Sequence, residues 1–130
     1  MENSLINFTL FSQVEVDPPI AVIEKAILFA KQNGIDGVIG LGGGSSLDTA
    51  KLIAALTYSE QTVNDAFGID KLEHSRLPLI QIPTTAGTGS EVTPISIVTT
   101  GEAMKMGIVS SVLLPDIALL DATLTVNLPS

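Results

Sequence analysis

Three consecutive glycines, Gly42 to Gly44, separate a short apolar run from a helix-like pattern in the stretch GVIGLGGGSSLDTAK. An ordinary turn between a strand and a helix needs only one glycine. Glycines cost conformational entropy, so the backbone here has a role that a side chain would obstruct. Such a turn directs backbone N–H groups and the positive end of the helix dipole outward, which favours an anion such as phosphate. The alternative is a tight connection whose glycines serve packing alone.

Two familiar phosphate-binding patterns can be compared with this loop, and neither fits it cleanly. The Walker pattern has Gly-Lys-Ser/Thr at the helix start, whereas here Ser45 and Ser46 follow Gly44 and the nearest lysine is Lys51. The dinucleotide fingerprint G-x-G-x-x-G would need glycine at Ser45. The loop therefore predicts an anion site, but its pattern does not identify the anion.

Hydrophobic periodicity predicts strands and helices in alternation. Apolar residues at helical spacing predict a first helix with Asp17 as its N-cap, Pro18 at its first position and Gly34 at its end. Short apolar runs predict strands at residues 37–41, 77–83 and 117–121, and an alternating segment predicts a β-hairpin over residues 95–111. Strand and helix in this order imply parallel pairing with right-handed crossovers, and hence an α/β fold.

A second helix is predicted from Ser46 to about Tyr58, directly after the glycines. Ser45 and Asp48 have the S-x-x-D spacing of a capping box, which marks the start of a helix. The segment has little polar surface, so we expect the helix to be largely buried.

A second loop without bulky side chains, PTTAGTGSEV, follows the strand predicted at residues 77–83. Thr84, Thr85 and Thr88 offer hydroxyl groups there, and the neighbouring glycines let a ligand approach the backbone. Open α/β sheets bind ligands at the carboxyl ends of their strands, so this loop is a second candidate for the same site. A surface turn rich in serine and threonine is the alternative interpretation.

Composition argues against several classes of partner. The net charge is −8, and no cluster of Lys and Arg is present to bind nucleic acid or an anionic membrane surface. The chain has no cysteine, which excludes disulfides and thiolate metal sites. No apolar run approaches the roughly 20 residues of a membrane-spanning helix. The start of the chain lacks a signal-peptide pattern, so we expect a cytoplasmic protein.

The two loops together strongly resemble the two signature stretches of the iron-containing (group III) alcohol dehydrogenase family, in order and in separation. The segment LPDIALLDATLTVNLP resembles the end of that family's nucleotide-binding domain. The resemblance implies a Rossmann-like parallel sheet with flanking helices and a β-hairpin, incomplete at both ends relative to the family. It also implies that residues 1–130 form a single, partial dinucleotide-binding domain, without the family's C-terminal helical metal domain.

The resemblance further implies a set of cofactor contacts. In the family's pattern, the residues that hold NAD or NADP correspond to Gly42, Gly43, Gly44, Ser45, Asp48, Thr84, Thr85, Thr88, Lys105, Leu124 and Leu128. The glycines and Ser45 would cradle the pyrophosphate. Thr84 and Thr85 would line the adenosine side, with Thr88 close by. Lys105 would reach a ribose, and the two leucines would border the cleft. For Asp48, a role as a carboxylate at the helix start remains an open alternative.

The family transfers hydride between a small alcohol or aldehyde and the nicotinamide cofactor, and it binds iron or another divalent metal through an aspartate and histidines beyond the matched region. The single histidine here, His74, stands in a polar stretch and is expected to be a solvated loop residue. We therefore expect the cofactor-binding portion of a metal-dependent alcohol dehydrogenase, with no catalytic or metal-binding residue and no activity alone. Exposed strand edges predict a homo-oligomer. A non-catalytic nucleotide- or phosphate-binding module is the alternative.

Overall fold

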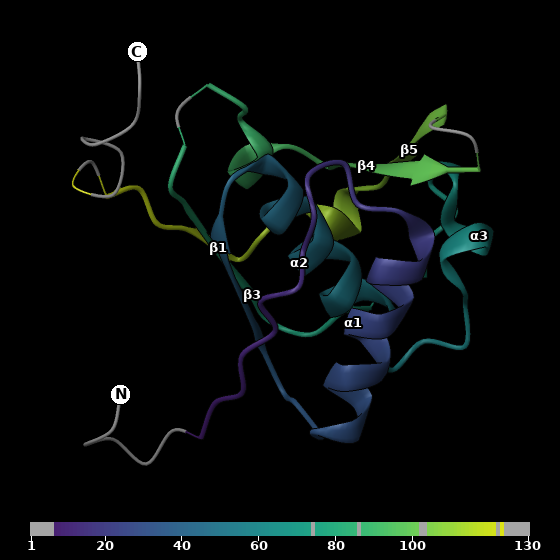
Figure 1. Cartoon of the computed structure of the whole chain (residues 1–130), viewed down its shortest axis with the longest axis horizontal. Coiled ribbons are helices and arrows are strands. Elements are labelled where there is room, and N and C mark those ends of the chain that lie inside the picture. Colours follow the sequence, from purple (N-terminus) through teal and green to yellow (C-terminus); the bar gives the residue numbers. More distant parts are fainter. Residues whose placement is uncertain (1–6, 74, 86, 102–103, 122, 124–130) are drawn as a thin grey trace.

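A three-stranded parallel sheet forms one half of the fold (Figure 1). Its strands are β1 (Val38–Gly42), β3 (Leu79–Pro83) and β6 (Ile117–Ala118), in the order β1-β3-β6. The strands are paired in register, with Gly42 at the end of β1 opposite Pro83 at the end of β3. The carboxyl ends of β1 and β3 therefore meet at one edge of the sheet, as the α/β prediction requires.

The structure is a computed structural model in which residues 7–73, 75–85, 87–101, 104–121 and 123 are described. The predictions made for His74, Leu124 and Leu128 concern residues outside this set. None of the helices among the described residues combines the length and apolar character needed to cross a membrane.

The predicted hairpin is present and belongs to a second sheet. This sheet contains β2 (Gly68–Ile69), β5 (Met104–Val109) and β4 (Ile95–Thr100), in the order β2-β5-β4. Strands β4 and β5 are antiparallel, with Ile95 opposite Val109 and Thr100 opposite Met104. Strand β2 adds a short parallel pairing to β5 that the sequence did not predict.

Helix α2 (Gly44–Leu56) lies between the two sheets and contacts β1 and β3 on one side and β4 on the other (Figure 1). Most of its residues from Leu47 to Leu56 are buried, which confirms the prediction of a largely buried helix. Gly40 in β1 lets the helix pack close to the sheet. A Cβ at Gly40 would overlap the side chain of Gln81 and would lie 2.7 Å from Cβ of Ala50.

Helix α1 (Ile20–Gln32) begins after both prolines, so the prediction of Asp17 as its N-cap is wrong. The ring of Pro19 disfavours the helical conformation at the preceding Pro18. Pro19 therefore serves as the N-cap with an extended backbone, and Asp17 takes a left-handed conformation with φ of 51°. The predicted stop at Gly34 holds approximately, because the helix ends at Gln32 and Gly34 has φ of 57°.

The main core forms where α1 and α2 meet the hairpin. Its buried side chains include Ile23, Leu52, Leu56, Val98 and Ile108. Helix α3 (Val63–Ala66), which the sequence did not predict, closes one side and starts with a capping box between Thr62 and Asp65. Two short 3₁₀ helices, Ser90–Val92 and Ser111–Leu113, complete the connections.

Candidate functional site

The glycine loop brings the start of α2 to the carboxyl end of β1. Gly42 has φ of +145°, and a Cβ there would lie 2.8 Å from Ser46 Oγ. Gly43 is the N-cap of α2, and it can offer no side-chain hydrogen bond to the helix. The first-turn N–H groups of α2 thus lack a side-chain cap, and such groups attract an anion.

The loop between β3 and β4 lies against these glycines, and in Figure 1 it arches in green over the start of α2. The N–H of Thr84 donates to the carbonyl oxygen of Gly42 at 2.9 Å. A Cβ on Gly43 would stand 3.4 Å from Cγ2 of Thr85, and one on Gly44 would stand 3.4 Å from Cγ2 of Thr88. The structure therefore brings the glycines together with the threonines of the second loop.

The side-chain hydroxyl of Thr85 is a buried polar group beside the glycine loop. Within the described part of the chain, its Oγ1 is buried and forms no hydrogen bond. A buried hydroxyl without a partner costs about 1–3 kcal/mol, so most such groups in folded proteins are satisfied. Oγ1 would lie 3.5 Å from a Cβ placed on Gly43, so it faces the glycine at the N-cap of α2.

Ser45 does not cap α2, and the predicted capping box is wrong. The helix begins at Gly44, so Ser45 lies within its first turn. Its Oγ instead accepts a hydrogen bond from the N–H of Asp17 at 3.1 Å. The predicted cap partner, Asp48, turns toward β4, because the earlier helix start places it beyond reach of the helix terminus.

Asp48 and Lys51 hold α2 to β4 and the segment before it. The Nζ of the fully buried Lys51 donates to the carbonyl oxygen of Ile95 at 2.8 Å, to Thr93 Oγ1 at 3.3 Å and to Asp48 Oδ1 at 3.4 Å. The other carboxylate oxygen of Asp48 accepts from the N–H of Ile97 at 3.2 Å. Burial lowers the pKa of Lys51, and the neighbouring Asp48 opposes this shift. Both oxygens of Asp48 thus have protein partners, and its contact with a cofactor stays a prediction.

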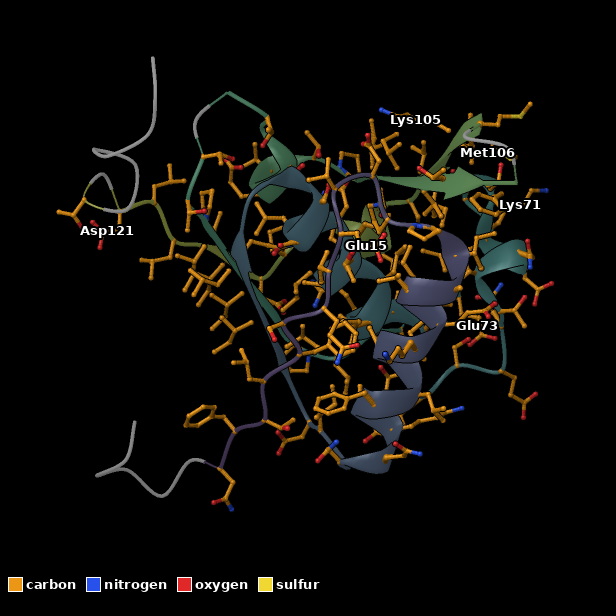
Figure 2. All side chains as sticks on the ribbon, in the orientation of Figure 1. Glu15, Lys71, Glu73, Lys105, Met106 and Asp121 are labelled. Carbon is orange, nitrogen blue, oxygen red and sulfur yellow. The ribbon has the colours of Figure 1, made fainter. Side chains whose placement is uncertain are left out.

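Lys105 lies on β5 and points away from the core (Figure 2). Its Nζ forms an ion pair with Asp17 Oδ2 at 3.2 Å, and both side chains are about half exposed. Because Asp17 also donates to Ser45, Lys105 is linked to the glycine loop through one residue. The place of Asp17 before Pro18 predicted a helix cap, and no pattern in the sequence predicted its contacts with Ser45 and Lys105.

Metal ligands do not gather in the described residues. Among them, no three His, Cys, Asp or Glu side chains lie close enough together to hold a metal ion. These residues therefore do not fit an iron site, and we assign none of them as an iron ligand.

Comparison with known proteins gives consistent matches along the whole described chain. The family profile described as iron-containing alcohol dehydrogenase matches residues 1–122. The chain is 45% identical over 123 residues to long-chain-alcohol dehydrogenase 1 of Geobacillus thermodenitrificans, which covers 92% of this chain and 31% of the relative. It is 41% identical over 125 residues to sulfoacetaldehyde reductase of Bilophila wadsworthia, which covers 95% of this chain and 32% of the relative.

A solved structure gives the same match at the level of the fold. Sulfoacetaldehyde reductase from Bifidobacterium kashiwanohense, crystallised in complex with NAD+, superposes with a TM-score of 0.87 at 33% identity. The superposition covers 94% of this chain and 33% of that one, and it confirms the predicted Rossmann-like α/β fold. The chain thus spans about a third of the length of the relatives that it matches.

Proposed function

The chain belongs to the iron-containing alcohol dehydrogenase family, and from this we propose that it binds the nicotinamide dinucleotide of such an enzyme. In this proposal, residues 1–130 act as one partial dinucleotide-binding domain. The pyrophosphate lies on the residues from Gly42 to Ser45, and the second loop, with Thr84, Thr85 and Thr88, lines the adenosine side.

One observation carries this proposal. The helix α2 begins without a side-chain cap at Gly43, and the buried hydroxyl of Thr85 lies beside it with no partner among the residues that the structure describes. A phosphate oxygen at this position would accept from the N–H groups of α2 and from the Thr85 hydroxyl together. The uncapped helix start and the Thr85 hydroxyl suit a phosphate group, and the related reductase crystallised with NAD+ supports a dinucleotide as the ligand.

A substitution of Gly43 by serine tests the site directly. Serine is a slightly better N-cap than glycine and is compatible with the extended backbone of Gly43, whose φ is −83° and ψ is −172°. We expect Gly43→Ser to leave the free energy of unfolding, measured in urea, unchanged or slightly higher. Its hydroxyl would occupy the N–H groups that the phosphate needs, so NAD affinity measured by calorimetry should fall about tenfold or more.

Gly37→Ser is the matched control for this experiment. A Cβ at Gly37 would lie 3.7 Å from the carbonyl oxygen of Pro78, an ordinary contact, at the other end of β1. NAD, NADP and ADP-ribose should each be titrated, and this variant should bind them as the unsubstituted chain does. The proposal fails if the unsubstituted chain binds none of the three, or if Gly43→Ser binds them unchanged.

An alcohol dehydrogenase transfers hydride between an alcohol or aldehyde and its cofactor, and this chain spans about a third of the length of such relatives. A nicotinamide dinucleotide supplies or accepts the hydride in that reaction, and the described residues supply its binding site. We propose that the chain alone does not reduce aldehydes or oxidise small alcohols. An NADH-linked aldehyde assay with added ferrous ion checks this, and turnover would contradict it.

A further inference from the structure

Asp17 joins the start of α2 to the β4–β5 hairpin. Its N–H donates to Ser45 Oγ at 3.1 Å, and its carbonyl oxygen accepts from Thr99 Oγ1 at 2.9 Å. Its carboxylate pairs with Lys105 Nζ at 3.2 Å. Thr99 and Lys105 are themselves opposite each other in β4 and β5. Asp17 therefore connects Ser45 in the first turn of α2 with Thr99 and Lys105 of the hairpin, and the sequence predicts cofactor contacts for both Ser45 and Lys105.

The backbone of Asp17 is held in a conformation that most residues avoid. Its φ of 51° is left-handed, and aspartate and asparagine tolerate this region better than other residues with a Cβ. Such conformations persist where the surroundings fix them. Here the bonds to Ser45 and Thr99 occupy both backbone polar groups of Asp17, and the N–H of Thr99 also donates to the carbonyl oxygen of Pro18 at 3.1 Å.

The bond to Asp17 has a consequence for the hydroxyl of Ser45. A serine hydroxyl has one proton to donate and can accept through its lone pairs. Because Ser45 Oγ accepts from Asp17, its own proton is free to be donated to another acceptor. In the first turn of α2, an anion at the helix N-terminus is the acceptor that the electrostatics favour.

We infer that Asp17 is a positioning residue for dinucleotide binding, which orients the Ser45 hydroxyl through its N–H and holds the Lys105 ammonium through its carboxylate. The inference rests on the proposed function. Both partners in the ion pair are about half exposed, 57% for Lys105 and 51% for Asp17. Ion pairs of this kind contribute little energy, so loss of the Asp17 charge should weaken NAD binding by about two- to fivefold.

A double-mutant cycle separates this role from general stabilisation. Asp17→Asn keeps the N–H and the tolerance of a left-handed backbone but removes the charge that holds Lys105. We expect Asp17→Asn to weaken NAD binding in calorimetry in the otherwise unsubstituted chain and to have no further effect when Lys105→Met is already present. A role of Asp17 that does not pass through Lys105 would instead weaken binding equally in both backgrounds, because the effects of independent sites add.

Asp70→Asn is the matched control. Asp70 also has a left-handed backbone, with φ of 55°, and its N–H donates to the carbonyl oxygen of Val109 at 2.8 Å. This variant should bind NAD as the unsubstituted chain does. If the unsubstituted chain does not bind NAD, the proposed function fails and the inference fails with it. If it binds NAD but Asp17→Asn changes nothing, or acts equally with Lys105→Met, the inference alone is overturned.

Discussion

Gly42 and Gly43 are neighbours in the chain, but glycine is needed at each for a different reason. Gly42 has φ of +145°, and a Cβ there would lie 2.9 Å from Cβ of Ser46. Gly43 has a backbone that any residue can adopt, and a Cβ there would meet only the methyl group and hydroxyl of Thr85. Folding therefore requires glycine at position 42, whereas the proposed ligand requires it at position 43.

Because folding requires glycine at position 42, we expect Gly42→Ala to lower the free energy of unfolding substantially. Strain in this backbone region costs about 1–3 kcal/mol, and the overlap with Ser46 adds to it. Urea unfolding measures the loss. Gly34→Ala is the control, because Gly34 has φ of +57° with nothing within 4 Å, so only a conformational cost of about 1–2 kcal/mol is expected. Equal losses in the two variants would show that the overlap at Gly42 is unimportant.

At the scale of elements, the ion pair between Arg76 and Asp116 joins the segments that lead into β3 and β6. The guanidinium donates to the two carboxylate oxygens at 2.7 and 3.2 Å, and the N–H of Leu79 donates to one of them at 2.9 Å. The hydrogen bonds from Arg76 and then from Leu79 lower the pKa of Asp116 from 3.8 to about 2.

This shift predicts how the stability of the fold depends on pH. Because the pKa is lower in the folded chain, the contribution of Asp116 is fully present above pH 3.8 and is lost as pH falls through about 2. Asp116→Asn should be less stable than the unsubstituted chain at neutral pH, and the difference in unfolding free energy should shrink over that acidic range. Urea unfolding across the range measures it, with Asp36→Asn as the control for an exposed aspartate. A difference that stays constant with pH would contradict this account.

The elements that the sequence predicted well are those with a strong local pattern. Apolar runs located β1 and β3, and alternation located the hairpin. Helix α3 and strand β2 were missed because they contain only four and two residues, too few for a period to be visible. The start of α1 was placed too early because the effect of Pro19 on Pro18 outweighs the usual preference for proline at a first helical position.

The candidate site was predictable in part for the same reason. Two loops with unusual local composition located it, and both lie at strand ends. The roles of Asp17 and Lys51 depend on partners far along the chain, since Asp17 and Thr99 are 82 residues apart and Lys51 and Ile95 are 44 apart. No local pattern encodes contacts over such separations. A lysine directly before the apolar run from Leu52 to Leu56 was the one available signal for Lys51.

At the scale of the whole molecule, the parallel sheet has one face packed on α2 and one that is largely exposed. Gly40, Gln81 and Ala118 are in register and share the face toward α2. Their neighbours Ile39, Ile80 and Ile117 are in register on the opposite face, where Ile39 and Ile117 are each 53% exposed. Exposed apolar rows of this kind favour association.

We propose that this face pairs with a second copy of the chain, as the sequence predicts for a homo-oligomer. Light scattering should then show a dimer or a larger assembly, and Ile117→Lys should shift it toward the monomer. Ile69→Lys is the control, because Ile69 is 71% exposed but lies in the second sheet. A monomer at high concentration in the unsubstituted chain would contradict the proposal.

The distance between α2 and the parallel sheet is set at Gly40 by the absence of a single carbon atom. In a library that samples every amino acid at each position and is selected for soluble expression, we expect position 40 to return glycine almost alone. Position 37, just before the same strand, should return many residue types, because a Cβ there would make only an ordinary contact at 3.7 Å from the carbonyl oxygen of Pro78. The residue types that survive selection would then show where the helix contacts the sheet, although the selection involves no ligand.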